Sequence, residues 1–179
     1  MVAKAPSGEA LHEAALRHLA RYAATEQGLA RVLARRIDRW VRAAGEDQAP
    51  EELTEAARGA KSAIPGVIQR LKSAGLLNDD AFAASRAKRL TRTGKSRRAT
   101  LAHLAAKGVR AADIPEDPRR ELAAACAYLR RRRAGPFGDA PEHKILGAMA
   151  RGGFTQEVAR RALALSRDEA EMLIQELHS

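Results

Sequence analysis

Cysteine is nearly absent from this chain of 179 residues, which contains only Cys126. A single cysteine can form neither an internal disulfide nor a cysteine-based metal cage, so neither device holds this fold together. Cys126 lies in an alanine-rich run with helical patterning, where we expect a buried and unreactive thiol.

Aromatic residues are also scarce and make up 3% of the chain. Proteins that read single-stranded bases by stacking need Phe, Tyr or Trp on an exposed surface. Most of the six aromatic residues here fall on apolar helix faces. Any contact with nucleic acid is therefore expected to be electrostatic rather than stacked.

The patterns that carry catalysis, metal binding or membrane insertion are missing as well. The five histidines lie in five different contexts, and none pairs with a second ligand at helical spacing. The sequence has no phosphate loop, dinucleotide-binding glycines or nucleophile elbow, and no apolar run of roughly 18 residues. We expect a cytoplasmic protein without a catalytic site, cofactor, metal or small-molecule substrate, and without a secretion segment at the start of the sequence.

Positive charge is abundant. The chain has 32 Lys and Arg against 22 Asp and Glu, a formal net charge of +10 and a pI near 10.6. Such a surface attracts polyanions, with nucleic acid first among them and an anionic membrane or an acidic protein second. Of the basic residues, 25 are arginine, which favours bidentate contacts to phosphate or carboxylate.

The surplus is concentrated in residues 81–112, which contain nine basic residues, from Arg86 to Arg110, and no acidic one. Lys88, Arg89 and Arg92 fall on one side of a predicted helix. A solvated surface is the plain alternative for any single basic run. Residues 130–133 are four arginines that wrap around a helix and cannot share one contact surface. The candidate contact residues are first Lys88, Arg89, Arg92, Lys95, Arg97 and Arg98, and second Arg31, Arg35 and Arg36.

Helical spacing dominates the apolar pattern, and no segment alternates as a strand would. One stripe combines Leu11, Ala15, Leu19 and Tyr22. Hydroxyl residues that can cap helices recur along the chain, with apolar residues six positions before and eight positions after each cap. These caps are Thr25, Ser96 and Thr155. We predict an all-α fold in which three tandem three-helix repeats, 10–76, 77–134 and 135–179, form an elongated, curved array.

Several segments resemble one protein family in their order along the chain. They are L-K-S-A-G-L-L-N-D-D-A-F-A at 71–83, T-G-K-S-R-R continuing to K-G-V at 93–109, the helix pair at 15–33, the segment at 144–163, and A-Y-L-R-R-R-R-A-G-P-F-G at 127–138. Together they are similar to the RecX family of bacterial recombinase regulators, and they cover most of 10–165.

The resemblance implies three tandem three-helix repeats and no catalytic activity. It also implies a partner of the RecA recombinase that binds RecA and single-stranded DNA within the RecA filament. We expect a monomer, although the sequence leaves the oligomeric state open. Such a protein would limit filament extension and with it ATPase and recombinase activity. Three positions depart from the family pattern: Gly152 stands where Arg is common, and Thr100 and His103 replace Ile and Glu.

Two other functions remain open from the residues themselves. The first is a DNA-binding regulator that acts without RecA, either independently of sequence or with 96–107 as the recognition helix of a helix–turn–helix. Thr100 and His103 would then face the base edges. The second is a helical-repeat scaffold for another acidic protein, for which DNA would be irrelevant.

Overall fold

The computed structural model describes residues 4–44, 49–109 and 114–178. Within those ranges the chain forms α-helices and one 3-10 turn, without a strand, which confirms the predicted all-α class. The chain divides into two units, residues 1–82 and 83–179. Each unit has its own cluster of buried apolar side chains.

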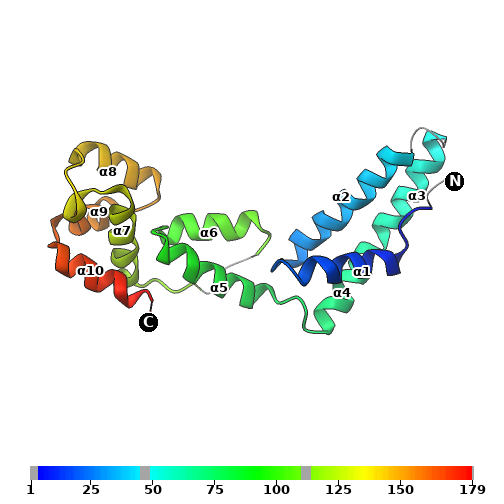
Figure 1. Cartoon of the computed structure of the whole chain (residues 1–179), viewed down its shortest axis with the longest axis horizontal. Helices are drawn as coiled ribbons and strands as arrows, with labels where there is room; N and C mark the ends of the chain where they lie inside the picture. Colours follow the sequence, from blue (N-terminus) through cyan, green and yellow to red (C-terminus); the bar gives the residue numbers. More distant parts are fainter. Residues whose placement is uncertain (1–3, 45–48, 110–113, 179) are drawn as a thin grey trace. The chain divides into compact units, whose positions relative to one another are not determined.

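The first unit contains four helices and the beginning of a fifth (Figure 1). They are α1 (Gly8–Leu19), α2 (Glu26–Ala44), α3 (Pro50–Ser62), α4 (Ile64–Ser73) and α5 (Asp79–Arg92). Its core consists mainly of branched aliphatic side chains such as Leu11, Leu29, Leu33, Ile37 and Leu71, all 0% exposed. Tyr22 was expected in the α1 stripe, but it is 61% exposed because α1 ends at Leu19.

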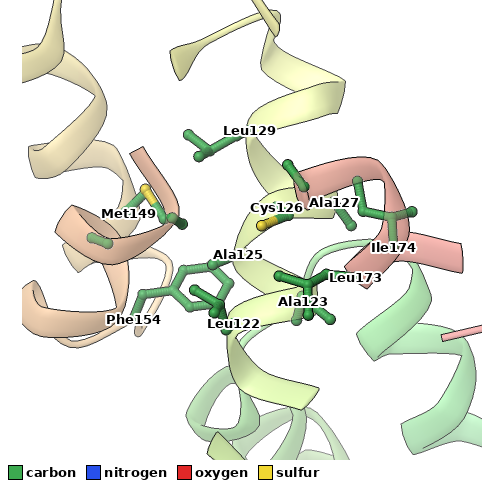
Figure 2. Close-up of a cluster of buried hydrophobic side chains, with 14 of the residues drawn as sticks. Leu122, Ala123, Ala125, Cys126, Ala127, Leu129, Met149, Phe154, Leu173 and Ile174 are labelled. Atoms are coloured by element: carbon green, nitrogen blue, oxygen red, sulfur yellow. The ribbon is translucent and has the colours of Figure 1, made fainter. Parts of the chain in front are cut away.

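The second unit holds the rest of α5 and the helices that follow it (Figure 1). These are α6 (Arg97–Ala106), α7 (Pro118–Arg132), the 3-10 turn η1 (Gly135–Phe137), α8 (Glu142–Arg151), α9 (Gln156–Ala164) and α10 (Arg167–Glu176). Helix α7 is the centre of this core and packs mainly against α9 and α10. Figure 2 shows Met149 and Phe154 on one side of α7 and Leu173 and Ile174 on the other.

Helix caps fall where the sequence predicts them. Thr25 Oγ1 accepts the Gly28 N–H at 2.9 Å, Ser96 Oγ accepts the Ala99 N–H at 3.1 Å, and Thr155 Oγ1 accepts the Val158 N–H at 3.2 Å. Each bond satisfies one of the N–H groups that a helix start leaves without a partner.

The turn between α5 and α6 lies directly on the backbone of α7. Gly94 has a φ of +75°, and a Cβ there would lie 2.5 Å from the Tyr128 nitrogen. Arg131 donates to the Thr93 carbonyl at 2.7 Å, and Ser96 Oγ donates to the Gly152 carbonyl at 2.7 Å. These contacts fix the basic helices α5 and α6 to the Ala-rich α7 and to the α8–α9 turn.

Candidate nucleic-acid interface

Helix α5 carries three of the candidate cations on exposed positions. Lys88 and Arg89 have no hydrogen-bond or ion-pair partner in the part of the chain that the structure describes. Arg92 is exposed too, but its Nε donates to the Leu177 carbonyl at 2.6 Å. Arg110 lies outside the described residues. Lys88 and Arg89 are therefore available to a partner as they stand, and Arg92 is partly occupied.

The three candidates that follow α5 have different roles. Lys95 and Arg98 are exposed, and neither has a partner among the described residues. Arg97 is half-buried: its Nε donates to the Ile114 carbonyl at 3.1 Å, and its guanidinium is 3.2 Å from Glu116. These bonds join the start of α6 to the chain before α7, so Arg97 holds the unit together.

The carboxylate of Glu121 completes this junction. It accepts the Arg97 backbone N–H at 2.9 Å, in the first turn of α6. Burial raises the pKa of Glu121 above its ordinary value of 4.5, and the hydrogen bond and charge of Arg97 oppose the shift. Glu121 therefore carries its charge at a cost, which its contact with Arg97 partly offsets.

The candidates of the first unit lie on α2, and all three are exposed. Arg31 is bonded to Gln27, whereas Arg35 and Arg36 have no partner among the described residues. Arg39 and Arg42 are also exposed and extend the series 31, 35, 39 and 42, which follows one helix face opposite the core. The i, i+4, i+8 spacing of residues 31, 35 and 39 could have identified Arg39 as a further candidate from the sequence.

The two residues proposed to read base edges are not on an exposed face. Thr100 is 1% exposed, and its hydroxyl has no partner in the described part of the chain. The helix face that begins at buried Ser96 packs against the rest of the unit, so an apolar residue would fit position 100. His103 Nε2 is 3.2 Å from Arg86 Nε, and burial and nearby Arg86 lower the pKa of His103. The prediction that Thr100 lines an exposed face is wrong.

The four arginines at 130–133 point in different directions around the end of α7, as predicted. Arg130 pairs with Glu171 at 3.0 Å, Arg131 donates to the Thr93 carbonyl, and the Arg132 guanidinium lies 4.8 Å from the centre of the Tyr128 ring. Arg133 ends the helix in the left-handed conformation, with a φ of 52°. These side chains point to different neighbours and do not form one contact surface.

A hollow that the sequence did not reveal joins α5 to α7 and α10 in the second unit. Its volume is about 270 Å³, and it brings Lys88 and Arg92 together with Arg119 and Arg120 beside Glu176. Arg119 and Arg120 follow Pro118 at the start of α7, 27 or more positions after Arg92 in the sequence. Only the packing of α7 and α10 brings these cations together.

The described residues contain neither a metal site nor a membrane-spanning helix. No group of three or more His, Cys, Asp or Glu there could hold a metal ion. No helix in the same ranges is long and apolar enough to cross a membrane. Cys126 is buried, as predicted, and burial raises the pKa of its thiol to about 11.

Fold and charge thus define an all-α protein with exposed basic helices, and the comparisons with known proteins show its family. The chain is 33% identical to the regulatory protein RecX of Myxococcus xanthus over 165 residues, which covers 86% of this chain and 83% of that protein. It is 30% identical to the regulatory protein RecX of Agrobacterium fabrum over 105 residues, 55% of this chain and 57% of that protein. The chain belongs to the RecX family of regulatory proteins. No family model and no solved structure matches it.

Proposed function

We propose that this chain is a cytoplasmic, monomeric regulator that binds RecA and single-stranded DNA within the RecA filament, limits filament extension, and so lowers RecA ATPase and recombinase activity. The three repeats 10–76, 77–134 and 135–179 belong to the same proposal. Membership of the RecX family supports the proposal, since the named relatives are regulatory proteins.

The observation that carries the DNA part of the proposal is the set of exposed basic side chains without a partner among the described residues. In the second unit these include Lys88, Arg89, Lys95 and Arg98. Cations without an internal partner keep their full attraction for phosphate, and each phosphate they neutralise releases counterions. Binding is therefore expected to weaken steeply as salt is raised.

Inhibition of the RecA ATPase on single-stranded DNA tests the proposal. The informative variant replaces Lys88 and Arg89 with Glu. Its matched control replaces Arg160 and Arg161 with Glu, which changes the net charge equally on two exposed residues of α9. We expect the α5 variant to need about tenfold or more protein for half-maximal inhibition, because like charges would then face the partner. If the contact lies on α5, and not on every exposed cation of the second unit, the α9 variant should stay close to the unmodified chain.

Two results would count against the proposal. If the unmodified chain neither lowers the ATPase rate nor is retained by RecA filaments, the function is wrong. If the α5 variant is folded by circular dichroism and inhibits as well as the α9 variant, the function stands but the contact does not lie on α5.

A further inference from the structure

The hollow in the second unit gathers charge from three helices. Lys88 and Arg92 come from α5, Arg119 and Arg120 from α7, and Glu176 from the end of α10. Including Asp117, its lining has four cations and two anions, a net charge of +2. Convergent cations in a concave surface concentrate positive potential and attract anions.

The two carboxylates of the hollow have different hydrogen-bond partners. Asp117 caps α7, and its Oδ1 accepts the backbone N–H groups of Arg119 and Arg120 at 3.0 Å each. Glu176 instead binds a cation through its carboxylate. Its Oε2 accepts from Arg119 Nε at 2.7 Å, and Oε1 contacts the second arm of the same guanidinium. Removing Glu176 would free a guanidinium, whereas removing Asp117 would damage a helix start.

The remaining cations of the hollow are only partly used. The Arg92 Nε already donates a hydrogen bond to the Leu177 carbonyl. Lys88 and Arg120 have no side-chain partner in the described residues. The Arg119–Glu176 pair is itself exposed, with 71% and 45% of the two side chains accessible. An exposed ion pair of this kind is weak and easily exchanged for another anion.

We infer that the hollow is a binding site for a phosphate of a nucleic-acid strand, and that Glu176 occupies the phosphate position on Arg119 in the free protein. The fork of an Arg side chain accepts a carboxylate and a phosphate in the same bidentate geometry. A phosphate would exchange places with the Glu176 carboxylate and gain Lys88 and Arg120 as further partners. This site deepens the proposed function, on which it rests.

The test is the affinity of the full chain for a fluorescently labelled oligodeoxythymidylate, measured by anisotropy at several salt concentrations. The key variant is Glu176→Gln, which removes the competing charge. Its matched control is Glu171→Gln, on the same helix, which frees Arg130 from a similar pair at 3.0 Å outside the hollow. Both variants change the net charge by the same amount.

We expect Glu176→Gln to tighten oligonucleotide binding by about two- to fivefold, the size of a released surface ion pair. Its plot of log affinity against log salt should keep the slope of the unmodified chain, because one phosphate occupies the hollow in both complexes and only the competing carboxylate differs. Glu171→Gln should leave the affinity close to that of the unmodified chain. Arg120→Ala should weaken binding and reduce the slope by about 0.7, the value for one phosphate of a single strand.

Equal affinities of Glu176→Gln and Glu171→Gln for the oligonucleotide would overturn the site. So would an Arg120→Ala variant that is folded and binds as tightly as the unmodified chain. If Glu176→Gln tightened binding to RecA without DNA and left oligonucleotide binding unchanged, the ligand of the hollow would be a protein carboxylate and the inference would be wrong.

The RecA ATPase assay on the same proteins separates this inference from the proposed function. Suppose that the unmodified chain inhibits RecA but the two Gln variants bind the oligonucleotide equally well. The phosphate site would then be refuted, and the proposed function would stand. If the oligonucleotide results are as expected but the chain does not inhibit RecA, the phosphate site stands and the proposed function is refuted.

Discussion

Helix α2 of the first unit and the helices of the second unit differ in how far their arginines are bound within the chain. On α2 of the first unit, Arg35, Arg36, Arg39 and Arg42 are exposed and have no partner among the described residues. In the second unit many arginines bind their own chain, among them Arg92, Arg97, Arg119, Arg130 and Arg131. Formal charge is thus a poor guide to binding capacity, because a guanidinium that already donates to a carbonyl or carboxylate has less to offer a partner.

The hydrophobic cores of the two units also differ in the size of their buried side chains. The first unit buries large aliphatic side chains, whereas α7 of the second unit buries the consecutive small residues from Ala123 to Ala127. Small side chains let neighbouring helices and turns come close to the α7 backbone, but they contribute less apolar area each. The second unit therefore depends more on close backbone contacts and on arginine hydrogen bonds.

The largest expected loss of stability comes from a substitution at Gly94, where the α5–α6 turn lies against the α7 backbone. In Gly94→Ala the new Cβ would lie 2.5 Å from the Tyr128 nitrogen, at a φ of +75°. We expect the free energy of unfolding to fall by about 3 kcal/mol or more, from left-handed strain and overpacking together. Urea titration would measure this loss, with the reactivity of buried Cys126 reporting on the second unit and the fluorescence of Trp40 on the first.

Gly75→Ala is the matched control in the first unit. Its φ is +71°, but a Cβ there has nothing within 4 Å. It should cost only the backbone strain, about 1 kcal/mol. Equal losses for the two variants would mean that close packing on α7 is not what distinguishes the second unit.

A smaller effect is expected from the arginines themselves. Arg97→Ala removes the bonds to the Ile114 carbonyl and to Glu116, and should lower the free energy of unfolding by about 1–2 kcal/mol. Arg39→Ala removes an exposed side chain that has no partner among the described residues, and should change stability by no more than about 0.5 kcal/mol. Thermal unfolding followed by circular dichroism gives both values. If both substitutions were neutral, the bonds of Arg97 would not support the second unit.

The smallest effect is a pH dependence in the second unit. Burial raises the folded-state pKa of Glu121 above 4.5, so the folded state holds the proton more tightly than the unfolded state does. The resulting stability is present below the ordinary pKa and is lost as the pH rises through the folded pKa. Glu121→Gln should therefore be more stable than the unmodified chain at neutral pH, with an advantage that shrinks as the pH falls towards 4.5. A difference in stability that does not vary with pH would contradict this assignment.

Local features were predictable because they depend on neighbours in the sequence. Thr25, Ser96 and Thr155 cap helices as predicted, since the capping bond reaches only three residues along the chain. The burial of Cys126 followed from its alanine-rich run. The family could be recognised for a similar reason, because the order of short segments along the chain carries the resemblance.

Tertiary structure decided which polar residues are buried and which cations are free. A helical wheel places Thr100 on the polar side of α6, but it is 1% exposed and lines a cavity together with Ala87 of α5 and Glu121 of α7. Arg97 looks like any other basic residue until its guanidinium is found against Ile114 and Glu116.

The sequence by itself determined the helical class, the helix starts and the excess of positive charge. Packing decided that Lys88, Arg92, Arg119 and Arg120 share a hollow with Glu176. The reason is that periodicity and capping act over a few residues, whereas a cluster of charges depends on which helices meet, and that is set by how α7 and α10 bury their apolar faces.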